Sequence, residues 1–325
     1  LALLLVACGG GGGGSSIPED AVLSQMRGTA QLREVAYAQG VTHHDHVVAD
    51  SHPFSSMLCS VGAVDLAAYG YVEKEFFLSG KANVYDLDAD ERAVVRSTGH
   101  PYSTRLLVRY PSDAAKFSGR VVIDILNASS GVDLEDLWRR SWDHILKSGH
   151  AYIGITSKTD TANALKRFDA ARYAELQWQV DGADENGLVW DMLSHLGTQL
   201  RKPGTGGLLG TLTPNWVYLG GQSQSGMYLN TYLSAFADRL AVARDGAKPL
   251  FDGYLNLVGP ASVAIRSGGA NPQKLYKATA VPQIAIMSEA EHKFSQLPAS
   301  PGFPPFAAYV RPADSDSASS KFRLY

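Results

Sequence analysis

The sequence is poor in cysteine, lacks a long apolar run and carries no excess of positive charge. With only two cysteines among 325 residues, a disulfide framework and a zinc site built from cysteines are both excluded. No stretch of about 18 apolar residues occurs, so the sequence contains no candidate membrane-spanning helix. The 32 acidic residues slightly outnumber the 29 basic ones, which gives no electrostatic basis for nucleic-acid binding. What remains, at 45% hydrophobic, is a globular composition with enough chain for a large core.

The first sixteen residues differ in composition from the rest of the chain. Leu1–Ala7 is apolar, and Leu5-Val6-Ala7-Cys8 resembles the lipobox of bacterial lipoproteins, where the chain is cut before a cysteine that is then lipidated. Gly9–Gly14 follows as a flexible tether. We therefore interpret residues 1–16 as a clipped signal remnant with its tether. A lipid on Cys8 is expected to hold the protein at a bacterial membrane, on its periplasmic or extracellular face.

Residues 17–70 form a weakly patterned lead-in segment with one helical stretch around Ala21–Ala38. Over residues 71–325, apolar β-forming runs alternate with helical periodicity, which predicts one α/β domain. The expected strands are 71–84, 105–110, 120–126, 151–156, 216–220, 254–258, 283–287 and a last one beginning at 322. The expected helices are 134–148, one that spans 188–200, and 227–240, with a long irregular stretch at 157–182.

Strands that alternate with helices predict a mostly parallel central sheet with helices on both faces. The first two strands have no helix between them, so one edge of the sheet is expected to be antiparallel. Asp133 is the expected cap of helix 134–148. Because binding sites in such sheets lie at the carboxyl ends of the strands, residues that follow the strands are the functional candidates.

The strongest local signal is the run Gly220-Gly221-Gln222-Ser223-Gln224-Ser225-Gly226, between an apolar strand and an amphipathic helix. A tight turn from strand to helix needs small residues two positions either side of its tip. With Ser223 as the tip these are Gly221 and Ser225, whereas Ser225 as the tip would put the bulky Met227 there. Ser223 is therefore the predicted nucleophile, and the Gln224 N–H at the helix start is a predicted oxyanion donor.

A second oxyanion donor is expected from the loop after strand 120–126. This loop runs Asn127-Ala128-Ser129-Ser130-Gly131-Val132-Asp133, and the N–H of Ala128 or of Ser129 is the candidate. Small polar residues would equally suit a simple connection between a strand and a helix, so both interpretations stay open.

An acid and a base are expected after later strands, in the chain order serine, acid, histidine. After strand 283–287, Glu291 lies at the expected offset and Glu289 is the alternative. The base is expected in the loop after the last strand. Since the sequence stops inside that strand, we expect the catalytic histidine beyond Tyr325. His292, together with another acid such as Asp252, is the alternative.

With these residues in place, the chain resembles the bacterial alpha/beta hydrolase domain-containing proteins from about residue 70 to its end. The matching stretches are 71–85, 102–111, 119–133, 149–156, 165–176, 219–226, 282–291 and 314–325. Most distinctive are the GxSQS motif at 221–225 and the N-x-S/T-x-G-x-D loop at 127–133. The resemblance implies an α/β-hydrolase fold, Ser223 as nucleophile, Glu291 or Glu289 as acid, and ester hydrolysis. Two departures are Asp124-Ile125, where relatives commonly have Glu-Trp, and Gly226, where alanine is common.

The sequence therefore predicts a serine hydrolase that cleaves a small-molecule carboxylic ester through an acyl-enzyme intermediate, with no cofactor and no metal. Amide, thioester or acyl-transfer chemistry on the same scaffold is an alternative. A second alternative is a non-catalytic lipoprotein that uses the scaffold as a binding surface. Neither the particular ester nor the oligomeric state is indicated by the sequence.

Overall fold

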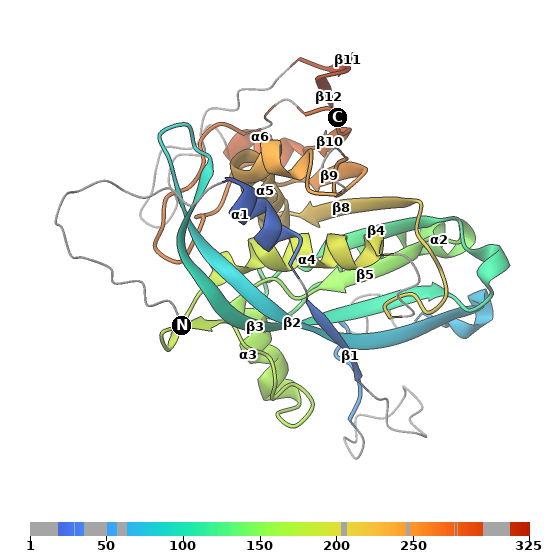
Figure 1. Ribbon diagram of the computed structural model, residues 1–325. Helices are drawn as coiled ribbons and strands as arrows, with labels where there is room; N and C mark the ends of the chain where they lie inside the picture. The colour runs from blue at the N-terminus through green and yellow to red at the C-terminus, as the bar shows by residue number, and fades with distance from the viewer. Residues whose placement is uncertain are drawn as a thin grey trace, which may run out of the picture.

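The protein is described by a computed structural model that covers residues 19–28, 30–35, 51–56, 64–202, 207–244, 248–275, 277, 279–294 and 313–325. Its centre is a ten-stranded sheet with strand order β1-β2-β3-β5-β4-β8-β9-β10-β12-β11 (Figure 1). The strands are β1 Gln31–Val35, β2 Tyr71–Leu87, β3 Ala93–Pro111, β4 Arg120–Ile125, β5 Ala151–Ile155, β8 Trp216–Gln222, β9 Gly253–Leu257, β10 Gln283–Ile286, β11 Ser315–Ser317 and β12 Ser320–Leu324. A separate small hairpin pairs β6 Gln179–Val180 with β7 Ala183–Asp184.

The helices are α1 Glu19–Met26, α2 Asp136–Lys147, α3 Thr159–Phe168, α4 Val189–Arg201, α5 Gln224–Leu240 and α6 Glu289–Phe294. Short 3-10 turns occur at Ala67–Tyr69, Ala114–Lys116 and Asn186–Leu188. No helix within these described parts of the chain is both long and apolar enough to cross a bilayer. The segment 1–16, with Cys8, lies outside the described residues.

The predicted fold class is confirmed by the pairing of the strands. The run β5-β4-β8-β9-β10-β12 is parallel throughout, and β1, β2, β3 and β5 pair antiparallel at one edge. In Figure 1 the long β2–β3 hairpin runs along one side of the molecule. The strand β1 lies within the lead-in segment and pairs with β2, so residues 31–35 belong to the same sheet.

Helices cover both faces of the sheet, as two neighbouring glycines in β8 show. A β-carbon on Gly220 would meet Leu137 of α2 at 2.8 Å, whereas one on Gly221 would meet the backbone of Ser225 in α5. Successive residues of a strand point to opposite faces, so α2 and α5 lie on opposite sides of β8. Helix α4 packs beside α5, where the rings of Trp190 and Tyr232 stack with centroids 6.3 Å apart.

Two local expectations are wrong. The stretch 157–182 is not irregular throughout, because α3 occupies Thr159–Phe168 and buries Ala162 and Leu165, one turn apart. The helix expected around Ala21–Ala38 instead ends at Met26, and the chain re-enters the sheet as β1. At Gly28 a β-carbon would lie 2.8 Å from Gln25 O and 2.9 Å from the His195 ring, so the turn from α1 toward β1 needs a residue without a side chain there.

The start of α2 is capped differently from the prediction. Asp133 does not cap the helix, which begins at Asp136. The carboxylate of Asp124, in β4 beneath it, accepts the Leu137 N–H at 3.0 Å and the Tyr152 hydroxyl at 2.9 Å through Oδ2. Asp124 is fully buried, and its Oδ1 has no hydrogen-bond partner among the described residues. Burial raises the pKa of this carboxyl to about 7.

We predict that Asp124→Asn stabilises the protein at pH 8 by on the order of 1–3 kcal/mol, because it removes the charge of a buried carboxylate that, in the described part of the chain, has no cation beside it to pair with. Asparagine keeps an oxygen for the Leu137 N–H and removes the buried charge. The folded carboxyl titrates near 7 and the unfolded one near 3.8, so the folded state binds the extra proton between these values. The contribution of Asp124 to stability is therefore fully present below about pH 4 and is lost as the pH rises through about 7.

Urea unfolding of both proteins from pH 4 to pH 8 measures this difference. The gap in the free energy of unfolding should widen with pH, and it should stay flat for Asp143→Asn, a control on the exposed side of α2. A gap that does not change between pH 4 and pH 8 would show that Asp124 does not titrate in this range.

Candidate active site

The turn between β8 and α5 has the unusual backbone conformation that its small residues suggested. Ser223 has φ 55° and ψ −119°, in a region that residues other than glycine rarely adopt. Its N–H donates to Leu257 O of β9 at 2.8 Å. A β-carbon on Gly221 would lie only 2.4 Å from Ser225 O, so the turn could not close this tightly with a larger residue at 221. The chain thus reverses from strand to helix at Ser223.

The two serines of the turn differ in environment. Ser223 is half-buried, at the outer end of β8. Ser225 is fully buried, where its hydroxyl donates to Leu126 O at 3.0 Å and accepts from Lys158 Nζ at 2.6 Å. Of the two serines, only Ser223 is partly exposed to solvent.

Glycine at 226 allows α5 to approach the chain after β9. A β-carbon on Gly226 would lie 2.4 Å from Asn256 Oδ1 and 2.9 Å from the Gly259 Cα. Asn256 in turn accepts the Gly259 N–H at 3.0 Å and donates to Asn230 of α5 at 2.9 Å. The first turns of α5 are therefore locked against the end of β9, which holds the turn at Ser223 from the helix side.

The loop after β4 reaches the turn through Asn127. Its Nδ2 donates to Gln222 O at 2.9 Å and to Gln222 Oε1 at 3.1 Å, while its Oδ1 accepts the Ser129 N–H at 2.7 Å. The Ala128 N–H donates to Gln224 Oε1 at 3.2 Å. The structure thus brings the loop and the turn together. The Ser129 N–H donates within the loop, to Asn127, whereas the Ala128 N–H donates to Gln224 at the start of α5.

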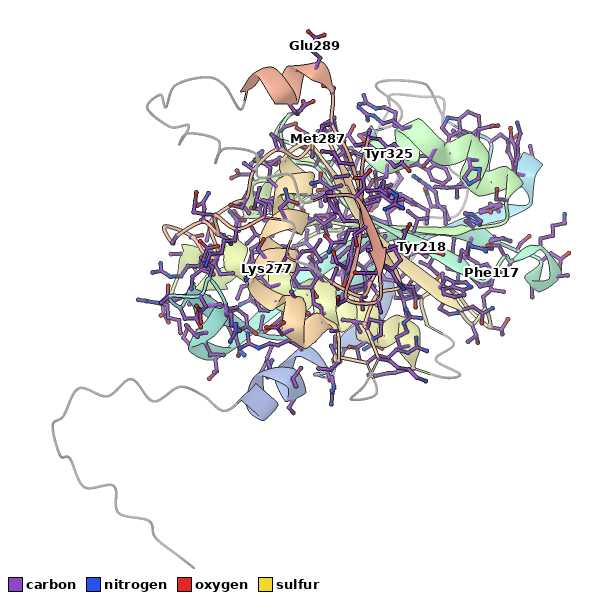
Figure 2. All side chains as sticks on the ribbon, turned by 90° about the horizontal axis from the view of Figure 1, so that it is seen from above. Phe117, Tyr218, Lys277, Met287, Glu289 and Tyr325 are labelled. Carbon is purple, nitrogen blue, oxygen red and sulfur yellow. The ribbon has the colours of Figure 1, made fainter. Side chains whose placement is uncertain are left out.

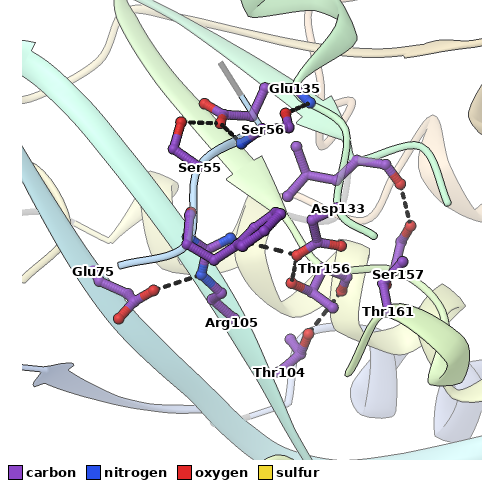
Figure 3. A network of polar contacts seen from close by, with 12 residues as sticks. Ser55, Ser56, Glu75, Thr104, Arg105, Asp133, Glu135, Thr156, Ser157 and Thr161 are labelled. Atoms are coloured by element: carbon purple, nitrogen blue, oxygen red, sulfur yellow. Dashed lines mark hydrogen bonds and ion pairs between the residues drawn. The ribbon is translucent and has the colours of Figure 1, made fainter. Parts of the chain in front are cut away.

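The second end of this loop, at Asp133, is held by buried hydrogen bonds and ion pairs between side chains (Figure 3). Asp133 accepts a hydrogen bond from Thr156, at the end of β5, and lies 3.4 Å from an Arg105 nitrogen. Arg105 also forms an ion pair with Glu75 at 2.5 Å, and Glu75 forms another with Arg172 at 2.6 Å. All of these side chains are buried. The last residue of the N-x-S/T-x-G-x-D motif therefore anchors the loop to β3 and β2.

The strand register places the acid candidates at the same edge of the sheet as Ser223. Gln222 pairs with Leu257, and Leu257 with Ile286, so the residues after β8 and after β10 lie at one level. Two strand spacings separate them, about 10 Å. Glu291 is half-buried, and its Oε2 accepts from the N–H and the hydroxyl of Ser288. Glu289 is exposed and points away from the body of the protein in Figure 2.

Two candidates were named for the base: His292, with Asp252 as its acid, and a histidine beyond Tyr325. Asp252, the suggested partner of His292, lies before β9 at the opposite edge of the sheet, where it binds Arg201 and accepts the Val217 N–H at 2.7 Å. The structure therefore does not bring Asp252 to Ser223. The side chain of His292 lies outside the described residues. Tyr325 O accepts the Met287 N–H at 2.9 Å (Figure 2), so any residue after Tyr325 emerges at the edge that holds Ser223.

Lys158 is a component of this region that the sequence analysis missed. It lies three residues after the end of β5, and the residue is 2% exposed. A lysine placed at the carboxyl end of an apolar strand, between Ser157 and Thr159, was the available signal. A charged residue in such a position is normally taken as part of a solvated loop.

A family model described as an alpha/beta hydrolase domain matches residues 38–325. A comparison with curated proteins found no match. Among solved structures, the chain is similar to a protein described as a dienelactone hydrolase from Klebsiella pneumoniae (12% identity, 77% of this chain and 85% of that one, TM-score 0.33). It is also similar to the rice cell wall degrading esterase LipA from Xanthomonas oryzae (10%, 59% and 43%, TM-score 0.31). A third is acetyl xylan esterase 1 from Thermoanaerobacterium sp. (8%, 73% and 55%, TM-score 0.35).

These structural likenesses are too distant to carry an argument about activity. The family match is different, because it covers most of the chain, including every strand of the sheet except β1, the loop at 127–133 and the turn at Ser223. The protein therefore belongs to the α/β hydrolase family and has the α/β-hydrolase fold.

Proposed function

We propose that the protein is a serine hydrolase that cleaves carboxylic esters through an acyl-enzyme intermediate. The observation that carries this proposal is the conformation of Ser223, a half-buried serine at φ 55° between a parallel strand and a helix start. Residues in such strained conformations cluster at functional sites. The neighbouring N–H groups of Gln224 and Ala128 supply what an attacked carbonyl needs, two backbone donors on adjoining segments.

In this mechanism the Ser223 Oγ attacks the ester carbonyl while a base takes its proton. The carbonyl oxygen, now an oxyanion, accepts from the Gln224 and Ala128 N–H groups, and displaces Gln224 Oε1 from the latter. The base then returns the proton to the leaving alcohol, which gives the acyl-enzyme. Water activated by the same base releases the acid and restores Ser223.

We assign Ala128 rather than Ser129 as the second donor. The Ser129 N–H is bound to Asn127 Oδ1, and Asn127 is itself held by Gln222 through two hydrogen bonds. The partner of the Ala128 N–H is the end of the half-buried Gln224 side chain, which can rotate away. The donor with the more easily displaced partner is the one that a substrate can use.

We assign Glu291 as the acid, and a base carried by a loop after the last strand, β12, would lie at the same edge of the sheet. Glu291 is half-buried and follows β10, whose end lies two strand spacings, about 10 Å, from the end of β8 before Ser223, and this leaves room for an imidazole between the two strand ends. The backbone of Tyr325 reaches that edge beside Met287. His292, next to Glu291, is the competing base.

Ser223→Ala should abolish covalent labelling by a fluorophosphonate probe and lower kcat/KM for p-nitrophenyl acetate by at least about 10³-fold, because the acyl-enzyme can no longer form. The experiment uses the complete gene product, with any residues beyond Tyr325. Ser225→Ala is the matched control, since it removes the other hydroxyl of the turn and should leave the label on Ser223. Peptide mass spectrometry identifies the labelled residue.

A label on a residue other than Ser223, or turnover that survives Ser223→Ala, would refute the assignment. A complete protein that neither binds the probe nor turns over ester would favour a binding lipoprotein. A higher kcat/KM for a matched amide or thioester than for the ester would change the assigned reaction but not the nucleophile.

Glu291→Gln should lower kcat by about 10²- to 10⁴-fold, because the base loses the carboxylate that orients it and stabilises its charged form. Glu289→Gln, two residues earlier and exposed, should change kcat by less than about threefold. Steady-state kinetics on both variants separate the two carboxylates. The reverse pattern would transfer the role of the acid to Glu289.

The localisation proposal depends on Cys8, which we propose is lipidated and holds the protein on a bacterial membrane. In the precursor expressed in a bacterial host, Cys8→Ser should move the protein from the membrane fraction to the soluble fraction. The support is the sequence Leu5-Val6-Ala7-Cys8 followed by glycines. Mass spectrometry of the N-terminal peptide tests the lipid directly, and an unmodified Cys8 in membrane-bound protein would contradict the proposal.

A further inference from the structure

Lys158 is buried between the two segments that carry the proposed oxyanion donors. Its Nζ lies 2.6 Å from Leu126 O, 2.7 Å from Ser157 Oγ and 2.6 Å from Ser225 Oγ. The ring of Tyr228 in α5 covers it, with the centroid 4.6 Å from Nζ. Ser157, shown in Figure 3, lies near the residues that anchor Asp133. The lysine thus joins the end of β4, the end of β5 and the first turn of α5.

The directions of these hydrogen bonds favour the charged form of the lysine. The hydroxyls of Ser157 and Ser225 both donate to Leu126 O, each at 3.0 Å. Each hydroxyl donates its single hydrogen to Leu126 O, so it can only accept a hydrogen bond from Lys158. Three acceptors therefore face Nζ. An ammonium group has three N–H donors and satisfies all of them, whereas a neutral amine would turn a lone pair toward an oxygen.

The partners of Lys158 adjoin the two oxyanion donors. Leu126 precedes Ala128 by two residues, and Ser225 directly follows Gln224. We propose that Lys158 is a positioning residue of the oxyanion site, whose ammonium group clamps the loop after β4 to the first turn of α5 and so sets the spacing of the Ala128 and Gln224 N–H groups. This role rests on the proposed function of Ser223.

A second link between the segments does not duplicate this clamp. Asn127 binds Gln222, which lies before the turn, through neutral hydrogen bonds. Lys158 binds Ser225, which lies after the turn, and binds it with a charged donor. Hydrogen bonds from charged donors are roughly twice as strong as neutral ones, so Lys158 fixes the helix side of the site more firmly.

The charged groups around Lys158 make the clamp sensitive to pH. Burial lowers the pKa of Lys158 to about 7, while Asp133 before α2, Asp124 in β4 and Asp136 in α2 act in the opposite direction. From α5, Tyr228 faces the lysine, and burial raises the pKa of its hydroxyl, so the ring stays neutral. As the pH rises through the pKa of Lys158, one N–H is lost and the clamp weakens.

The test compares Lys158→Met with the wild type in the complete gene product. Methionine matches the stem of the lysine side chain up to Cε and removes the three donors of Nζ. We expect kcat for p-nitrophenyl acetate to fall about 10- to 100-fold with KM within twofold, because the loss affects only the transition state. Affinity for a trifluoromethyl ketone, whose adduct with Ser223 is a hemiketal that carries an oxyanion, should fall by a similar factor. The alkaline decline of kcat in the wild type should be missing in the variant.

Lys166→Met is the matched control, since it removes the charge of a nearby lysine, within α3, that has no hydrogen bond to the partners of Lys158, and it should leave all three measurements unchanged. If Lys158→Met does not fold by circular dichroism, Ser225→Ala decides. It removes one acceptor of the clamp and should lower kcat and inhibitor affinity about 3- to 10-fold at unchanged KM.

A folded Lys158→Met with wild-type kcat and inhibitor affinity, in a protein that reacts through Ser223, overturns the role of Lys158 alone. So does Ser225→Ala with unchanged values if the first variant fails to fold. A wild-type protein that is inert toward ester and probe overturns the proposed function, and this role with it. The two failures are therefore distinguishable.

Discussion

The structure depends on the backbone of Ser223, which is held in a conformation that costs on the order of 1–3 kcal/mol and persists only where its surroundings enforce it. The elements on both sides of the turn hold the Ser223 backbone in place. Before the turn, β8 is paired on both sides, with β4 and with β9. After it, α5 buries Leu229, Tyr232 and Phe236 in the main core. The two elements meet over Gly221, where there is no space for a side chain.

The loop that faces this turn is held at both ends, which explains why its motif has polar residues at its first and last positions. Asn127 at the start is bound to Gln222, and Asp133 at the end is bound to Thr156 and Arg105. From Arg105 the buried charges continue through Glu75 to Arg172. A buried ion network adds little net stability, but it permits few alternative arrangements. The residues between its ends, Ala128 included, therefore have a defined position relative to Ser223.

The sequence was sufficient for the elements that are buried along most of their length. The apolar runs of β4, β5 and β8 predicted their strands because both faces are covered, and steric reasoning chose the tip of the turn at Ser223 over Ser225. Prediction from the sequence failed where contacts between distant segments determine the local structure. Helix α3 opens with polar residues and buries only a narrow side. Asp133 was taken as a helix cap because a carboxylate before a helix usually is one, but a buried arginine competes for it more strongly. Lys158 could not be placed, because nothing in a linear sequence shows which lysine is enclosed by three acceptors.

The resting contact between Gln224 and Ala128 bears on how the site would favour a transition state over a substrate. Gln224 Oε1 is an amide oxygen, and it occupies the donor that a substrate carbonyl would use. Replacing one neutral carbonyl oxygen by another changes the hydrogen-bond energy little, so this donor adds almost nothing to substrate binding. An oxyanion in the same place accepts a charge-assisted hydrogen bond, about twice as strong. In the proposed mechanism the exchange would therefore stabilise the charged intermediate selectively, and only such selective stabilisation accelerates a chemical step.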